Sequence, residues 1–178
     1  MNIVLIGYRC SGKSSSGKII AEKMGRGFID IDAMIEEKAG CPIEEIIAVK
    51  GWEHFRVLEK EVIKALTGTD NLVIATGGGV VIDEDNVKNL KKNGFVVWLK
   101  ADIDILKERM EIDEISGITR PSLTGEDSVE EVRKVLDIRE PLYRRARDFE
   151  LDTGAISIGE AADLIMKKAS IRIHRTRS

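Results

Sequence analysis

An octapeptide near the start of the chain has the spacing of a phosphate-binding loop. Residues 7–14 read GYRCSGKS, which fits G-x-x-x-x-G-K-[ST], and they lie between an apolar run and a helical pattern. In such a loop the backbone N–H groups surround phosphates at the positive end of the helix. Lys13 is expected to reach the β- and γ-phosphates, and the Ser14 hydroxyl to bind Mg²⁺. The predicted nucleotide contacts come from Gly7, Arg9, Cys10, Ser11, Gly12, Lys13, Ser14 and Ser15.

Two carboxylates, Asp30 and Asp32, follow a short apolar stretch in the segment FIDID. In open α/β sheets the carboxyl ends of the strands face the ligand crevice, and strand alternation would direct both side chains to the same side. The alternative is that Asp32 caps the helix that follows.

Two further groups are ambiguous when each is taken alone. Arg56 and Glu59 lie three residues apart in a predicted helix, where a surface ion pair is the simplest interpretation. Gly77, Gly78 and Gly79 follow an apolar run at residues 72–75. Three glycines at the end of a strand indicate either a tight turn or the close approach of another group to the backbone.

The elements that must position these residues alternate along the chain. Apolar runs predict strands at residues 3–6, 28–29, 72–75, 95–99 and 149–151, and helical spacing is found at 14–24, 52–66, 83–92, 102–110 and 157–168. Continuous apolar strands between helices predict one doubly wound α/β domain with a parallel sheet. Residues 111–127 are polar and aperiodic, and we expect them to form a mobile lid.

Composition and charge exclude several classes of protein. The 178 residues carry a formal net charge of −3, so no electrostatic argument favours a nucleic-acid partner. No apolar run reaches membrane-spanning length, no signal peptide is recognised, and two cysteines form no disulfide framework. We therefore expect a cytoplasmic domain without a membrane partner, ending in a flexible basic tail at residues 171–178.

The order of the motifs resembles that of the shikimate kinases. The phosphate loop, FIDID, G-x-E-x-F-R-x-x-E at residues 51–59 and the glycine triplet are followed by Arg120-Pro121 and by REPLYRR at residues 139–145. The similarity extends from residue 2 to about residue 168. It implies a P-loop fold like that of nucleoside monophosphate kinases, with a five-stranded parallel sheet in the order 2-3-1-4-5. The implied reaction transfers the γ-phosphoryl group of ATP to the 3-hydroxyl of shikimate, in aromatic amino acid biosynthesis.

The resemblance also implies roles on the acceptor side. Asp30 would hold Mg²⁺ through water, and Asp32 would orient the attacking hydroxyl of shikimate. Arg56 and Arg139 would bind the substrate carboxylate, for which a guanidinium fork is better suited than an ammonium group. Glu59 would hold Arg56 or contact a substrate hydroxyl. The substrate-binding region would span about residues 32–66, with the backbone at residues 77–79 contacting the substrate ring.

Two expectations concern the nucleotide side. Arg120, on the lid, would close over the phosphates as an arginine finger. The loop after the last strand, which contains Thr153, lacks the arginine or proline that many shikimate kinases place beside adenine. Main-chain atoms of that loop and a stacked Arg109 would then hold the base.

Other functions of a phosphate loop remain as alternatives. A GTPase is disfavoured because no N-K-x-D segment is present. A gluconate-type sugar-acid kinase and a catalytically silent nucleotide-binding module both share the loop. We expect a kinase that works as a monomer, with ATP as a substrate and Mg²⁺ as its cofactor.

Overall fold

The computed structural model describes residues 1–115 and 129–177, and its strands form a single parallel sheet. The strand order is β2-β3-β1-β4-β5, which confirms the order expected from the resemblance. Strand bounds are β1 (Asn2–Ile6), β2 (Gly27–Asp30), β3 (Leu72–Ala75), β4 (Gly94–Lys100) and β5 (Phe149–Asp152). The register pairs Val4 of β1 with Ile74 on one side and with Val96 on the other, so β1 is central.

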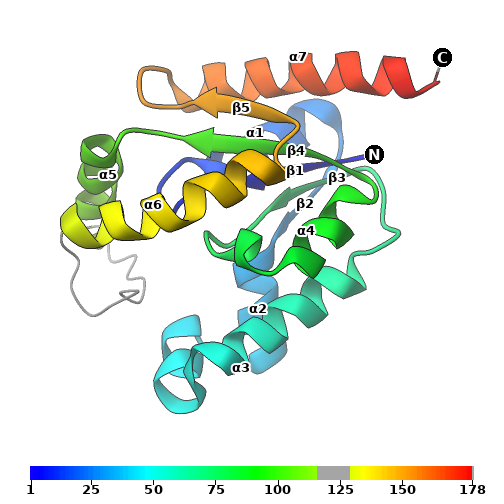
Figure 1. Ribbon diagram of the computed structural model, residues 1–178. Coiled ribbons are helices and arrows are strands. Elements are labelled where there is room, and N and C mark those ends of the chain that lie inside the picture. Colours follow the sequence, from blue (N-terminus) through cyan, green and yellow to red (C-terminus); the bar gives the residue numbers. More distant parts are fainter. Residues whose placement is uncertain (116–128, 178) are drawn as a thin grey trace.

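Helices cover both faces of this sheet (Figure 1). Their bounds are α1 (Lys13–Met24), α2 (Ile31–Ala39), α3 (Ile43–Ala65), α4 (Glu84–Lys91), α5 (Ile103–Ile115), α6 (Val129–Ala146) and α7 (Ile158–Arg177), with a 3-10 turn η1 (Val80–Ile82). Alternate residues of β1 supply the two cores. Ile3 and Leu5 pack with α1 and α7, whereas Val4 and Ile6 pack with α2, α3, α4 and α6. The three-layer arrangement predicted from the sequence is therefore confirmed.

Helix α6 was missed by the periodicity analysis, which recognised only the motif at its C-terminal end. Pro141 lies inside the helix and charged residues are frequent along it, so the segment resembles a polar connection. Its buried face becomes clear only in the structure, where Val132, Leu136 and Tyr143 pack inward.

Two predicted boundaries were wrong. Helix α5 continues to Ile115, so the first five residues of the expected lid are helical, and the remainder of the lid lies outside the described residues. Helix α7 continues to Arg177, where a flexible tail was expected from residue 171. The reason is an apolar spacing that persists: Ala162, Ile165 and Ala169 are buried, and Ile173 one turn later is partly buried.

Helix α3 is kinked at Gly51, which has φ 80° and ψ 169°. The predicted helix starting at residue 52 is its second half. The first half, Ile43 to Lys50, was not indicated by hydrophobic spacing, but it lies in the substrate-binding region that the resemblance implied. The kink sets the direction of the segment that carries Arg56 and Glu59.

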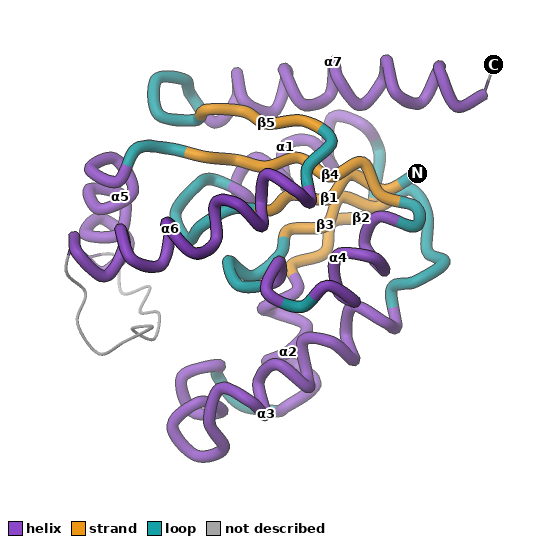
Figure 2. Tube along the Cα trace, in the orientation of Figure 1, coloured by secondary structure: helices purple, strands orange, loops and turns teal. Residues whose placement is uncertain are grey.

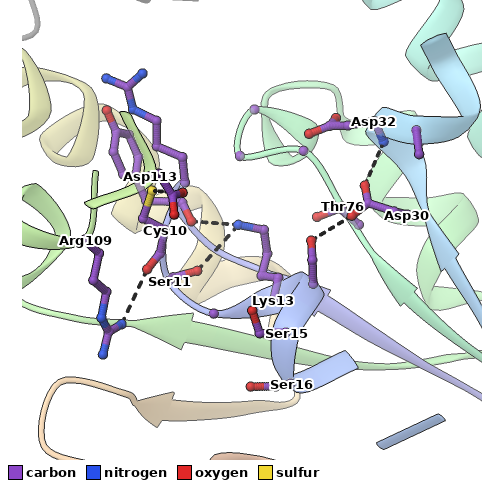
Figure 3. A pocket seen from close by; sticks show the side chains of 18 of the residues that line it. Cys10, Ser11, Lys13, Ser15, Ser16, Asp30, Asp32, Thr76, Arg109 and Asp113 are labelled. Carbon is purple, nitrogen blue, oxygen red and sulfur yellow. Dashed lines mark hydrogen bonds between the residues drawn. The ribbon is translucent and has the colours of Figure 1, made fainter. Parts of the chain in front are cut away.

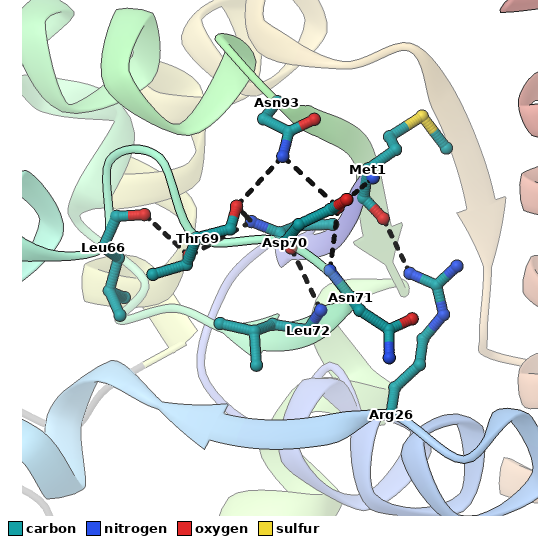
Figure 4. A network of polar contacts seen from close by, with 9 residues as sticks. Met1, Arg26, Leu66, Thr69, Asp70, Asn71, Leu72 and Asn93 are labelled. Atoms are coloured by element: carbon teal, nitrogen blue, oxygen red, sulfur yellow. Dashed lines mark hydrogen bonds and ion pairs between the residues drawn. The ribbon is translucent and has the colours of Figure 1, made fainter.

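A polar network fastens the amino ends of the strands (Figure 4). The Asn2 side chain donates to the Thr69 carbonyl at 3.0 Å and accepts from the Leu72 N–H at 3.0 Å. Asn93 donates to the same Thr69 carbonyl at 2.9 Å. These bonds stabilise the end of the sheet at which β1, β3 and β4 begin. At the opposite end, β1, β3, β4 and β5 are each followed by a loop, drawn in teal in Figure 2.

Within the described residues, no helix combines the length and apolar character that crossing a membrane would require.

Candidate active site

The carboxyl ends of the strands open into one cavity of about 1040 Å³. Predicted site residues from both halves of the chain line it: Arg9, Cys10, Ser11, Gly12, Lys13, Ser14, Ser15, Asp30, Asp32, Arg56, Glu59, Gly77, Gly78, Gly79, Arg109, Arg139 and Thr153. Figure 3 shows Lys13 and Ser11 of the phosphate loop on one side of it and Asp30, Asp32 and Thr76 on the other. The cavity therefore brings the predicted donor and acceptor residues together. Arg120 lies outside the described residues, and its position in the site is untested.

The phosphate loop follows β1 and ends at the first turn of α1, as the motif predicts. Lys13 is buried, and its ammonium group donates to the Tyr8 carbonyl at 2.6 Å and to the Ser11 hydroxyl at 3.5 Å. Cys10 adopts a positive φ of 59°, which is unusual for a residue with a side chain. The loop thus curls around the lysine, and its backbone can receive phosphates.

Asp30 and Asp32 both face the cavity, but for a different reason from the one predicted. Asp30 ends β2, whereas Asp32 already lies in the first turn of α2, so strand alternation does not relate them. Asp30 is also the residue that caps α2, since its carboxylate accepts from the Asp32 N–H at 3.1 Å. The alternative in which Asp32 is merely the cap is therefore wrong.

Oxygen ligands suited to Mg²⁺ lie beside the phosphate loop. The Ser14 hydroxyl donates to the Asp30 carboxylate at 2.6 Å. Mg²⁺ in kinases uses one or two protein oxygens together with water and substrate phosphates. Ser14 and Asp30 therefore fit the ion that the sequence predicts.

Arg56 and Glu59 form a pair in the wall of the cavity rather than on the surface. One Arg56 nitrogen, Nη1, donates to both Glu59 carboxylate oxygens, at 2.9 and 2.8 Å. Glu59 is fully buried, and burial raises the pKa of its carboxyl despite the nearby guanidinium. The rings of Trp52 and Phe55 lie 5.6 and 5.0 Å from the centre of the Arg56 guanidinium. Arg56 is therefore held in one orientation.

Residues that the sequence analysis did not select complete this arrangement. The guanidinium of Arg56 stacks against Trp52, which the motif includes only as a variable position. The Asn86 side chain is buried in α4 and donates to Glu59 Oε2 at 3.5 Å. The only signal for Asn86 in the sequence was its place in a predicted helix. Helical spacing alone does not show whether a polar residue there is buried or exposed.

The glycine triplet makes room for protein side chains. None of the three glycines has a positive φ, so a left-handed turn does not explain them. A Cβ on Gly79 would overlap the Arg56 guanidinium, and one on Gly77 would lie 2.7 Å from Asp32 Oδ1. A Cβ on Gly78 would make only contacts of 3.4 Å or more. A side chain at Gly77 or Gly79 would therefore displace the Asp32 carboxylate or the Arg56 guanidinium from its present position.

Arg139 lies on α6, is largely buried, and has its guanidinium near the glycine segment. A Cβ on Gly78 would lie 3.7 Å from Arg139 Nη1, whereas one on Gly79 would meet Arg56. Two guanidinium groups from different helices therefore converge on the backbone at residues 78–79.

Arg109 and Thr153 line the other end of the cavity and are hydrogen-bonded to each other. Arg109 donates to the Thr153 carbonyl at 2.7 Å, to the Thr153 hydroxyl at 3.2 Å and to the Cys10 carbonyl at 3.4 Å. The Thr153 hydroxyl also lies 3.2 Å from the Ser11 carbonyl. These contacts tie the loop after β5 to the phosphate loop. Arg109 thus lies beside the phosphate loop with its guanidinium anchored by carbonyl groups, and its stacking on adenine stays a prediction.

Known proteins match this chain along almost its whole length. A family model described as shikimate kinase matches residues 9–170. A shikimate kinase from Thermodesulfovibrio yellowstonii is 41% identical over 167 residues, which are 94% of each chain. The chain belongs to the shikimate kinase family. A shikimate kinase from Syntrophus aciditrophicus is 39% identical over 175 residues, with 94% of this chain and 90% of that one covered.

A solved structure agrees with the sequence matches. The shikimate kinase from Acinetobacter baumannii in complex with shikimate has a TM-score of 0.88 at 34% identity, covering 96% of this chain and 93% of that chain. As a member of the shikimate kinase family, the chain is an ATP-dependent kinase that acts on a hydroxyl group. The family assignment favours this activity over the gluconate-type kinase and the silent binding module.

Proposed function

We propose that the chain transfers the γ-phosphoryl group of ATP to the 3-hydroxyl of shikimate, giving shikimate 3-phosphate and ADP. One observation carries the proposal: a single cavity has a phosphate loop at one end and two converging guanidinium groups beside a glycine segment at the other. A phosphate loop selects the donor, and paired guanidinium groups suit an acceptor that bears a carboxylate.

On the donor side, the phosphate loop would hold the triphosphate and Lys13 would turn from the Tyr8 carbonyl to the β- and γ-phosphates. Ser14 and Asp30 would hold Mg²⁺, directly and through water respectively. When bound, this ion neutralises charge on the phosphate oxygens and helps to align them. Contacts to adenine would come from Arg109 and from the loop at Thr153.

On the acceptor side, Arg56 and Arg139 would bind the carboxylate of shikimate. Asp32 would accept a hydrogen bond from the 3-hydroxyl, orient it toward the γ-phosphorus and take its proton as the new P–O bond forms. Glu59 would hold the Arg56 guanidinium in place, in keeping with their two hydrogen bonds. Arg120 would add positive charge to the transferring phosphoryl group from the lid. Most of the rate enhancement would come from positioning and charge neutralisation.

A coupled assay of ADP release tests the proposal with three acceptors: shikimate, gluconate and a nucleoside monophosphate. We expect shikimate alone to stimulate ADP release well above the rate without acceptor, and only when Mg²⁺ or a similar divalent ion is present. Stimulation by gluconate instead of shikimate would support the sugar-acid kinase. Nucleotide binding without stimulation by any acceptor would support the silent module.

We also propose that the protein works as a monomer in the cytoplasm. The monomer is supported by the cavity, to which this one chain contributes every predicted residue that the structure describes except Gly7. The cytoplasm is supported by Cys10 and Cys41, which are not joined in a disulfide. Light scattering on a size-exclusion column should give a mass near 19.8 kDa. A mass of twice that value would contradict the monomer.

A further inference from the structure

Tyr143 is a buried residue that the proposed mechanism leaves without a role, although it lies next to the acceptor half of the cavity. The side chain is fully buried, and its ring stacks on Trp98 of β4, with 5.7 Å between centroids and 23° between planes. Helix α6 passes over β4 at this point (Figure 1). The core therefore fixes the ring, and the ring fixes the place of its hydroxyl.

The Tyr143 hydroxyl connects two parts of the site. It donates to the Gly78 carbonyl oxygen, and the Arg139 guanidinium donates to the same hydroxyl. Tyr143 follows Arg139 by one helical turn, so the two side chains leave the same face of α6. Burial raises the pKa of the Tyr143 hydroxyl, which keeps it protonated as a donor at neutral pH.

The backbone at Gly78 also lies close to the phosphate loop. A Cβ there would lie 3.4 Å from the Arg9 backbone nitrogen and 3.5 Å from the Gly7 carbonyl oxygen, so this backbone packs against the phosphate loop. Holding the Gly78 carbonyl therefore constrains Arg139 relative to both the glycine segment and the phosphate loop.

We propose that Tyr143 is a positioning residue for the acceptor, whose hydroxyl fixes the Arg139 guanidinium and the Gly78 backbone in the arrangement that receives the shikimate carboxylate and hydroxyls. The inference rests on the proposed function and extends it to a residue that does not itself touch the substrate.

The variant Tyr143→Phe keeps the stacked ring and removes only the hydroxyl. We expect the dissociation constant and KM for shikimate to rise about five-fold or more, because a hydrogen bond to a buried carbonyl and one from a guanidinium are both lost. The KM for ATP should change by less than about two-fold, since the phosphate-loop contacts remain. A purely structural role would lower thermal stability without this preference for the acceptor.

The matched control is Thr69→Val, which removes another hydroxyl that donates to a backbone carbonyl. The Thr69 hydroxyl donates to the Leu66 carbonyl at 2.7 Å, at the end of the sheet where the strands begin and away from the cavity (Figure 4). This control should lose stability without weakening shikimate binding. In an Arg139→Ala background, Tyr143→Phe should have a smaller effect on the shikimate dissociation constant than in the native protein, because the two residues act together.

Isothermal titration calorimetry and the ADP-release assay separate the possible failures. If the native protein releases ADP with shikimate but Tyr143→Phe binds shikimate within about two-fold of native, the inference is overturned and the proposed function stands. An equal rise in the KM for ATP and the KM for shikimate in Tyr143→Phe also overturns it. If the native protein shows no shikimate-stimulated ADP release, the proposed function fails and this inference fails with it.

Discussion

Arg56 is held by contacts that a lysine cannot reproduce. Its guanidinium bonds both oxygens of buried Glu59 and lies against two aromatic rings, with Gly79 leaving the space that it fills. We predict that Arg56→Ala raises the KM for shikimate roughly thirty-fold or more with little change for ATP, since losing one partner of a desolvated charge pair costs about 2–5 kcal/mol. Arg56→Lys should recover only part of this affinity, because an ammonium group lacks the fork.

Lys60 provides a matched control on the same helix. It pairs with Asp83 and Asp85 on the exposed surface, so Lys60→Ala should change the free energy of unfolding little and leave the KM for shikimate unchanged. Shikimate methyl ester tests the same contact without mutation. Equal rates with ester and acid in the native protein would contradict a carboxylate site at Arg56 and Arg139.

Glu59 predicts a pH dependence of stability. Burial raises its pKa above the ordinary 4.5, so the folded protein holds this proton to a higher pH than the unfolded chain does. Its contribution to the free energy of unfolding is therefore largest below pH 4.5 and falls as the pH rises through the folded pKa. The difference in unfolding free energy between native protein and Glu59→Gln should fall over that window, measured by urea titrations at several pH values.

Glu61 on the same helix gives the opposite sign. It is exposed, and its hydrogen bond to Lys38 lowers its pKa, so its contribution is present above pH 4.5 and is lost as the pH falls. The difference between native protein and Glu61→Gln should therefore rise with pH where that for Glu59→Gln falls. Parallel curves for the two variants would contradict the buried state of Glu59.

At the scale of the element, the kink in α3 decides where Arg56 points. Gly51 has φ 80° and ψ 169°, a region that is essentially restricted to glycine. We predict that Gly51→Ala lowers the free energy of unfolding by about 1–3 kcal/mol and weakens shikimate binding, because the second half of α3 must reorient. Nothing lies within 4 Å of the added Cβ, so a steric clash would not explain the loss.

Gly40 serves as the control for Gly51. It ends α2 in the left-handed helical region, with φ 75° and ψ 11°, which asparagine also adopts. Gly40→Asn should therefore be nearly neutral, as judged by the same denaturant titrations. If Gly51→Ala were equally well tolerated, the kink would not depend on glycine.

At the scale of the whole molecule, ligands should stabilise the entire sheet. The cavity is lined at the ends of separate strands, by Asp30 as the last residue of β2, Thr76 after β3 and Thr153 after β5. Shikimate at about one hundred times its Kd should add roughly 2.7 kcal/mol to the free energy of unfolding. For a chain of this size, the melting temperature should then rise by about 5–11 °C. Differential scanning calorimetry with gluconate at the same concentration should show no comparable shift.

The sequence by itself determined the donor site and the architecture. A phosphate loop is a local motif, because eight consecutive residues supply both the backbone groups and the lysine that surround phosphates. The strands can likewise be recognised as continuous apolar runs in the sequence, because parallel strands are buried on both faces of the sheet. The roles of Asp32, Arg56 and Arg139 came from the order of the motifs, and they remain predictions about this chain.

Only the tertiary structure decided which groups meet. Whether Arg56 and Glu59 form a surface pair or a buried one depends on α4 and the glycine segment, which follow them in the chain and pack over them. Helix α6 was hidden by its interior proline, and with it the contact between Tyr143 and Gly78, 65 residues apart. Burial and long-range contact arise from packing between elements, and hydrophobic periodicity reports only which face of each element is apolar.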